Sequence, residues 1–359
     1  MKKSFFFGID WGMILPAIVL VSLGLTAIFS INPDLFRSQL LFFILAIIFF
    51  LIFSQVNYKI LENNSRAIYV ISIILLILIL IVGVESRGAV RWFEFFGLRI
   101  QFSEIVKPFF AVALSSFLLR KENSSLTHFI LSIIFVVPLA ILIFLQPDLG
   151  NAIIYVVVTF FTMIFFGFPI RYFLGSFLLF VASLPFFWNF LHQYQKQRVF
   201  SFINPTDTLG ISYNAIQSSI AVGSGMLFGR GFGEGTQSVL KFLPERHTDF
   251  IYAALAESLG FVVAGVVVLC FGILLYRIYI VSIRVDDQFC RVFCAASFFL
   301  ILSQFFINTA MNMGFLPIVG IALPFVSYGG SSLLSNFVLL GLLSSISRSG
   351  ISPRVLEIK

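Results

Sequence analysis

Long runs of hydrophobic residues recur along this chain and restrict its possible folds more than any other feature. Each run is about twenty residues long, which is the length of helix that crosses the hydrocarbon core of a bilayer. Hydrophobic residues make up 59% of the 359 residues and charged residues only 11%, whereas soluble domains carry about 25% charged residues. The sequence therefore predicts an all-α polytopic membrane protein and excludes a soluble globular enzyme.

We predict about ten transmembrane helices in a single integral-membrane domain, residues 1–359. They cover residues 11–31, 38–56, 67–84, 102–119, 128–145, 150–167, 171–190, 250–276, 292–312 and 328–346. Of the 23 basic residues, 13 then lie on the side that holds both termini, which predicts a cytoplasmic N-terminus and C-terminus. The first run lacks a small-residue cleavage site, so we expect an uncleaved anchor. Basic residues that flank spans and bind anionic headgroups account for the net charge of +7 without nucleic acid.

Two outer segments are longer than the other connections. Residues 191–249 form the only long hydrophilic stretch, a large extracytoplasmic loop between the seventh and eighth helices. Its aromatic residues and mixed charges indicate an ordered, functional loop rather than a linker. Its glycine-rich part, 223–235, lacks the GK[ST] of a phosphate-binding loop and is expected to act as a hinge. The other outer segment, 85–107, carries several basic residues.

Ionisable residues within or at the ends of spans are the candidate site residues, because charge is costly to bury in a membrane. Glu104 and Lys107 are three residues apart on one helical face and can form an ion pair. That pair would either orient the helix or lend a basic group to an anionic ligand. Asp148, in FLQPDLGNA, is expected to be the N-cap of the next helix and can also face a shared cavity.

The stretch FLPERHTDF, residues 242–250, places Asp249 directly before the eighth span. A partly dehydrated carboxylate there is expected to have a raised pKa, as a general base requires. The alternative role for Asp249 is again a helix N-cap. Arg246 and His247 could orient it or contact phosphate, and Glu257 could lie on the same polar stripe.

Near the C-terminus, the stretch FLPIVGIALPFVSYGGSS, residues 315–332, contains two prolines and a Gly-Gly pair. These residues predict a broken, re-entrant element, which is stable at membrane depth only where protein or a water-filled cavity covers it. We expect it to line an outward-facing cavity together with the candidate residues.

The candidate residues combine carboxylates with basic groups on the outer face. Basic groups suit a phosphate or diphosphate, and an apolar groove suits a lipid tail. Two classes remain open: an enzyme that acts on a lipid-linked anionic substrate, and a transporter or flippase for such a lipid. A convincing internal repeat is absent from the sequence and the charges gather on one face, which favours the enzyme.

Three motifs together resemble the SEDS family (shape, elongation, division and sporulation): QPDLG at 146–150, FLPERHTDFIYAALAE at 242–257 and LPFVSYGGSS at 323–332. Members are ten-span peptidoglycan glycosyltransferases of the bacterial cytoplasmic (inner) membrane. QFSEIVK and YNAIQSSIAVGSG extend the likeness to nearly the whole chain. PERHTDF is similar to the elongation branch, RodA, since the division branch, FtsW, typically has Ala at the position of Arg246. Asn151 stands where the family usually has Thr.

The resemblance implies lipid II as substrate, polymerised into glycan strands during cell-wall elongation, with Asp249 as the catalytic residue. An α-linked donor and a β-1,4 product require one inverting displacement of undecaprenyl diphosphate, assisted by a base and by charge stabilisation. The expected substrate-binding residues are Glu104, Lys107, Asp148, Arg91, Lys196, Arg198, Glu245, Arg246 and His247.

The resemblance also implies partners: a class B penicillin-binding protein transpeptidase and the MreB, MreC and MreD elongation machinery. Mg²⁺ or Mn²⁺ could assist with the diphosphate, but the sequence contains no dedicated ligand set. A lipid II flippase is the alternative function.

Overall fold

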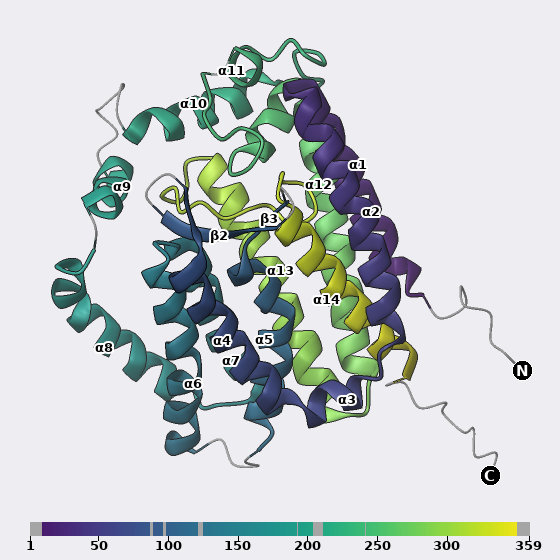
Figure 1. Ribbon diagram of the computed structural model, residues 1–359. Coiled ribbons are helices and arrows are strands. Elements are labelled where there is room, and N and C mark those ends of the chain that lie inside the picture. Colours follow the sequence, from purple (N-terminus) through teal and green to yellow (C-terminus); the bar gives the residue numbers. More distant parts are fainter. Residues whose placement is uncertain are drawn as a thin grey trace, which may run out of the picture.

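Helices that run from one end of the molecule to the other dominate the fold (Figure 1). The computed structural model describes residues 9–86, 89–95, 98–120, 125–191, 193–203, 211–240 and 242–349. Within them, eight helices are long and apolar enough to cross a membrane. These are α1 (Trp11–Ile31), α2 (Pro33–Gln55), α4 (Ser65–Val82), α6 (Leu126–Leu145), α7 (Leu149–Phe166), α12 (Ile251–Arg284), α13 (Gln288–Asn312) and α14 (Gly330–Ser349).

The two remaining predicted spans are also helical: α5 (Phe102–Leu118) and α8 (Ile170–Trp188). Helix α5 is shorter than the other spans, and the apolar part of α8 ends at Phe186. Every predicted span therefore contains a helix. Short helices complete the chain: α3 (Tyr58–Asn63), α9 (Gln193–Ile203), α10 (Ile211–Ser224) and α11 (Thr236–Val239). In Figure 1, α10 and α11 lie over one end of the bundle, which is the outer end in the predicted topology, and α9 lies to the side near that end.

The start of α1 and the end of α14 meet at the opposite end of the bundle. The Asp10 carboxylate accepts hydrogen bonds from Arg277 Nε of α12 at 2.9 Å and from Ser347 Oγ of α14 at 2.7 Å. The Asp10 backbone N–H donates to Ser344 Oγ at 3.2 Å. The start of α1 and the end of α14 therefore lie at one face, in agreement with the predicted cytoplasmic placement of both termini.

A small antiparallel sheet, which the sequence analysis did not anticipate, forms from the outer segment after α4. It has the strand order β1 (Val84–Ser86), β2 (Ala89–Phe95) and β3 (Leu98–Ile100). The β-branched and aromatic residues of AVRWFEF favour a strand. The sheet leads directly into α5 and so fixes where that helix begins.

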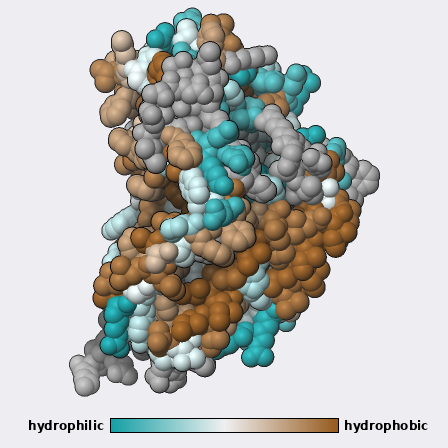
Figure 2. Space-filling model, turned by 90° about the vertical axis from the view of Figure 1, so that its left-hand side faces the viewer, coloured by the Kyte–Doolittle hydropathy of each residue, from teal (hydrophilic) through white to brown (hydrophobic). Residues whose placement is uncertain are grey.

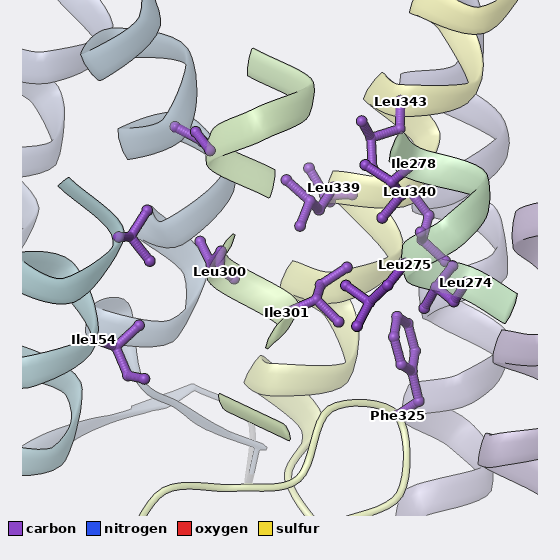
Figure 3. Close-up of a cluster of buried hydrophobic side chains, with 14 of the residues drawn as sticks. Ile154, Leu274, Leu275, Ile278, Leu300, Ile301, Phe325, Leu339, Leu340 and Leu343 are labelled. Atoms are coloured by element: carbon purple, nitrogen blue, oxygen red, sulfur yellow. The ribbon is translucent and has the colours of Figure 1, made fainter. Parts of the chain in front are cut away.

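The main hydrophobic core draws buried side chains from most of the long helices, and α12, α13 and α14 contribute many of them. Figure 3 shows Leu275 of α12 beside Ile301 of α13, with Leu340 of α14 and Phe325 of the preceding loop close by. On the outside, hydrophobic side chains form a broad band, with hydrophilic side chains mostly above and below it (Figure 2). This apolar exterior is the surface that lipid covers in a membrane protein.

Helix α12 is broken at Gly260, where φ is 79° and ψ is −178°. The residues on either side pair with the outer loop instead of continuing the helix. The N–H groups of Arg230 and Gly231 donate to the carbonyls of Glu257 and Ser258, at 2.9 and 3.2 Å. The N–H groups of Phe261 and Val262 donate to the carbonyls of Met226 and Leu227, at 2.8 and 3.2 Å.

This pairing attaches the loop firmly to the helix, so the expectation that 223–235 is a hinge was wrong. Glycine is required at the break, because a Cβ at Gly260 would lie 2.3 Å from the backbone nitrogen of Gly229. Gly229 also needs to be glycine, because a Cβ added there would lie 2.2 Å from the carbonyl oxygen of Ser258.

Gly260→Ala is expected to lower the free energy of unfolding by more than the 1–3 kcal/mol or so typical of backbone strain, since it also introduces a clash. Gly265→Ala is the matched control, because it lies in the same helix and nothing is within 4 Å of its added Cβ; alanine there should be neutral or stabilising. Unfolding in detergent, followed by circular dichroism, measures both. Equal stability of the two variants would refute the role assigned to the break.

Candidate active site at the outer face

The backbone carbonyl of Asp249 accepts hydrogen bonds from two side-chain amides of α13. Asn308 Nδ2 and Asn312 Nδ2 each donate to it at 2.9 Å, and both side chains are fully buried. Asn312 Oδ1 also accepts from the backbone N–H of Ala253 at 3.0 Å, and so satisfies a free donor in the first turn of α12. The start of α12 and Asp249 are therefore positioned by side chains about sixty residues further along the chain.

The two residues before Asp249 are held in the same way by the loop between α13 and α14. The N–H of Tyr328 donates to the carbonyl of His247 at 2.8 Å, and Ser327 Oγ donates to the carbonyl of Thr248 at 2.7 Å. The Tyr328 ring also meets the His247 ring edge-on at 5.7 Å. Three consecutive carbonyls are thus fixed, which leaves little freedom for the backbone of the HTD sequence.

The Asp249 carboxylate lies against this loop. A Cβ added to Gly320, which has φ +72°, would lie 3.4 Å from Asp249 Oδ2. On the other side, a Cβ added to Gly150 of α7 would lie 2.6 Å from the carbonyl of Val319. The loop around Gly320 therefore brings QPDLG and PERHTDF together, although the two motifs are about one hundred residues apart.

The N-cap position of α12 is Phe250 rather than Asp249, so the expectation that Asp249 is the N-cap residue was wrong. The reason is that Asn308 and Asn312 hold the first turn from outside the helix. The loop itself is non-helical between Asn312 and Gly330, as its prolines and glycines predict, and its central residues Ile321 and Leu323 are buried.

Asp148 is the N-cap of α7, as the sequence predicts. Its Oδ1 accepts from the N–H of Asn151 at 3.2 Å. Its Oδ2 accepts from Asn151 Nδ2 at 2.8 Å, from Gln101 Nε2 at 2.7 Å and from Ser103 Oγ at 3.3 Å. Four donors from α5, the residue before it and α7 thus converge on a buried carboxylate, which joins the starts of two helices.

Arg91 of β2 supports the turn that precedes Asp148. Its Nε donates to the carbonyl of Gln146 at 2.9 Å, and an Nη donates to the carbonyl of Pro147. Gln146 in turn donates to the carbonyl of Leu76 at 3.0 Å. The sheet therefore places a guanidinium beside the candidate site while part of its donor capacity holds the backbone.

Glu104 and Lys107 form the predicted ion pair on α5, with Nζ and Oε1 2.7 Å apart. Both side chains are buried, and Glu104 Oε2 has no hydrogen-bond partner among the described residues. The carbonyl of Glu104 accepts from Ser335 Oγ of α14 at 2.7 Å. The pair adds no net charge to the interior, and one carboxylate oxygen retains its capacity to accept.

Glu245 and Arg246 lie in the tight turn before α12. Thr248 Oγ1 donates to Glu245 Oε2 at 3.1 Å, and the N–H of Phe250 donates to the carbonyl of Glu245 at 3.2 Å. Burial lowers the pKa of the Arg246 guanidinium, an effect that nearby Glu245 opposes. Arg246 Nε is buried without a hydrogen-bond partner in the described part of the chain, so this nitrogen retains a donor that suits an anionic ligand.

Three residues that the sequence analysis considered do not join the residues around Asp249. They are Lys196, Arg198 and Glu257. Lys196 lies in α9, at the edge of the outer layer in Figure 1, and the side chain of Arg198 in the same helix lies outside the described residues. Glu257 does not share a stripe with Asp249. It accepts from the N–H groups of Gln237 and Ser238, at 2.7 and 2.9 Å, in the first turn of α11.

Sequence reasoning missed the amides of α13. Gln304, Asn308 and Asn312 are four residues apart, so they lie on one face of a helix that is otherwise largely apolar. This spacing is visible in the sequence, but our search for candidate residues in the spans concentrated on ionisable side chains and passed over these amides. All three are fully buried, and both polar atoms of the Gln304 side chain lack partners among the described residues.

In the described part of the chain, no three His, Cys, Asp or Glu side chains gather closely enough to hold a metal ion. The residues around Asp249 therefore do not fit a protein-built Mg²⁺ or Mn²⁺ site. The arrangement is instead an aspartate whose backbone is held at the outer end of a bundle, with Arg246 in the same turn. Arg91 supports the turn before Asp148, and Lys107 pairs with Glu104.

Comparison with known proteins gives a consistent set of relatives. A family model for FtsW, RodA and SpoVE, described as "Cell cycle protein", matches residues 3–351. The chain is 36% identical to the peptidoglycan glycosyltransferase MrdB of Escherichia coli K12 over 305 residues, which are 84% of this chain and 82% of MrdB.

Two solved structures share the fold. One is a chain from a study of polymerization and crosslinking by a peptidoglycan synthase complex, with a TM-score of 0.84, 27% identity and coverage of 95% of this chain and 98% of that one. The other is the rod shape determining protein RodA of Thermus thermophilus, with a TM-score of 0.73, 26% identity and coverage of 96% and 98%.

Asp148→Ala should lower the free energy of unfolding by at least about 1–2 kcal/mol, because it removes an N-cap and leaves buried donors unpaired. Asp34→Ala is the control: Asp34 is exposed in the first turn of α2, and its loss should change stability by less than about 0.5 kcal/mol. Chemical unfolding in detergent measures the difference. A neutral Asp148→Ala would show that the four donors do not depend on this carboxylate.

Proposed function

The chain belongs to the FtsW, RodA and SpoVE family of cell cycle proteins, and we propose that it polymerises lipid II with Asp249 as the general base. It is a RodA-type peptidoglycan glycosyltransferase and a multi-pass protein of the bacterial inner membrane. One observation supports the choice of Asp249 above all: three consecutive carbonyls, from His247 to Asp249, are fixed by α13 and the loop that follows it.

Immobilising a catalytic group has a direct kinetic benefit. A base must lie within hydrogen-bond distance of the proton that it removes, and a displacement of about 1 Å can cost about 100-fold in rate. Asp249 is half-buried, so the residue is partly shielded from water. The amides of α13 keep it at that position without using the carboxylate itself.

The reaction that we propose is a single displacement at the anomeric carbon. Asp249 accepts the proton of the acceptor 4-hydroxyl while that oxygen forms a bond to the anomeric carbon. The bond to the diphosphate breaks with its electron pair, and undecaprenyl diphosphate departs. Arg246, with its buried and unpartnered Nε, is suited to stabilise the charge that develops on the leaving group. Lys107 and Arg91 would then bind and orient the substrate from the other side.

The role of the remaining predicted residues follows from their contacts. Asp148 is assigned to shaping the site, because the four groups that donate to its carboxylate belong to the protein scaffold. Glu104 orients Lys107 through their ion pair. Glu245 and His247 belong to the turn that carries Asp249, and Lys196 and Arg198 remain predicted contacts for substrate from the outer loop.

A transpeptidase partner is part of the proposal. One matching structure comes from a complex that couples polymerization with crosslinking, which supports a penicillin-binding protein as partner for this chain. A class B transpeptidase is the specific partner that we propose. Contact with MreB, MreC and MreD rests on the family resemblance alone. Lipid II transport is not favoured, since named relatives are glycosyltransferases.

Asp249→Asn should reduce glycan polymerisation by about 100-fold to 10,000-fold, the usual contribution of a general base. The assay combines the purified protein, its transpeptidase partner and lipid II, and follows strand length on gels. Glu234→Gln, which changes an exposed carboxylate of the same outer loop, should retain full activity. Polymerisation by Asp249→Asn at the normal rate would rule out the base, and lipid II movement across vesicles without polymerisation would indicate a flippase.

Asn312→Leu should lower kcat by about 10-fold to 100-fold with little change in KM, because it loosens the mount of Asp249 and leaves the substrate contacts intact. Asn336→Leu is the control for burial, since Asn336 is an equally buried amide that bonds only within its own helix. Its folded fraction should turn over normally. If both variants lose the same activity per folded molecule, the hydrogen bond from Asn312 to the Asp249 carbonyl has no specific role in catalysis.

A further inference from the structure

Four large apolar side chains project from the outer loop. Met226 and Phe228 are each 81% exposed, Leu227 is 59% exposed and Phe232 is 50% exposed. We call these four residues the apolar tip. In water, such a cluster would be an unfavourable exposed patch, and patches of this kind mark surfaces that bind something apolar.

The tip has a fixed depth because the loop is attached to α12. Its residues 226 and 227 accept hydrogen bonds from Phe261 and Val262, just past the break at Gly260. From Phe261 to Arg284 the helix has 24 residues, or about 36 Å at 1.5 Å per residue. The hydrocarbon core of a bilayer is about 30 Å thick, so Phe261 and the tip lie about 6 Å beyond its outer boundary, at the level of the headgroups, when Arg284 lies at the inner boundary.

The tip also continues the lipid-facing surface of two spans. Phe261 of α12 is 69% exposed and Leu269, two turns further, is 61% exposed. On the other side, Phe29 at the outer end of α1 is 46% exposed and stacks on Phe232, with centroids 6.2 Å apart. The N–H of Gly233 donates to Ser30 Oγ at 3.0 Å. The exposed stripes of α1 and α12 thus both end at the tip.

We propose that the apolar tip inserts into the outer leaflet of the bilayer and anchors the large outer loop to the membrane surface. An apolar cluster at the boundary between hydrocarbon and headgroups is where insertion to a depth of about 5–10 Å is favourable. Arg230 and Glu234, which flank Phe232 and are exposed, lie where charged headgroups and water are available. The occupant is therefore a lipid surface, and this assignment does not depend on Asp249 being a base.

The anchor has a structural consequence for the rest of the molecule. The same loop segment that carries the tip donates to the carbonyls of Glu257 and Ser258, in the outer half of α12. That half-helix begins next to Asp249. Insertion of the tip therefore holds the outer half of α12 at a set height above the membrane.

Site-directed spin labelling tests the depth of the tip in the full-length protein. Phe228→Cys, Leu269→Cys and Glu234→Cys are labelled in nanodiscs of phosphatidylethanolamine and phosphatidylglycerol. The native cysteines Cys270, Cys290 and Cys294 are buried, and unsubstituted protein measures their background. Power saturation then compares collisions with oxygen, which partitions into lipid, and with a water-soluble nickel chelate.

The label at position 228 is expected to resemble that at 269, with a several-fold greater oxygen-to-nickel ratio than at 234. A ratio at 228 equal to that at 234 would place the tip in water and overturn the proposal. Protection of 228 from both reagents would also overturn it, since that result indicates cover by protein, such as a second copy of the chain. The measurement reports depth and not activity, so it is independent of the glycosyltransferase assays.

Discussion

Every backbone polar group in a membrane-spanning region needs a hydrogen-bond partner within the protein, and this constraint organises the whole molecule. Where the helices are continuous, they satisfy it themselves. The chain departs from helix at Gly260 and between α13 and α14. At the first break the outer loop supplies the missing partners, and the second is covered by buried side chains and by the turn that carries Asp249. The second departure lies next to the candidate site, and the first lies at the far end of the half-helix that begins beside Asp249.

Buried carboxylates likewise obtain their hydrogen-bond or ion-pair partners from the protein. The carboxylates of Asp10, Asp148 and Glu257 each accept from two or more donors, and each joins segments that are far apart in the sequence. Glu104 is neutralised by Lys107. At Asp249 the α13 amides hold the backbone carbonyl, which fixes the position of the residue in the fold.

The outer face combines the candidate site around Asp249 with an apolar surface. The lipid-linked substrate that we propose needs both, because its headgroup would reach the carboxylate while its tail stays in the bilayer. The break at Gly260 connects these two requirements physically. One half of α12 begins beside Asp249, and the other half begins beside the exposed side chains of Met226 and Phe228. The glycine-rich loop that joins them is therefore part of the scaffold.

Features that depend on local spacing were determined by the sequence alone: the hydrophobic spans, the Asp148 cap, the Glu104–Lys107 pair and the non-helical stretch after α13. Hydropathy, capping preference and helical periodicity act within a few residues, so they can be read directly. The β-sheet, the partners of Glu257, the docking of the glycine-rich loop and the grip of Asn308 and Asn312 on Asp249 were decided only by tertiary structure. Each of these needs groups from separate segments to meet, and local patterns carry no information about which distant segment will supply the partner.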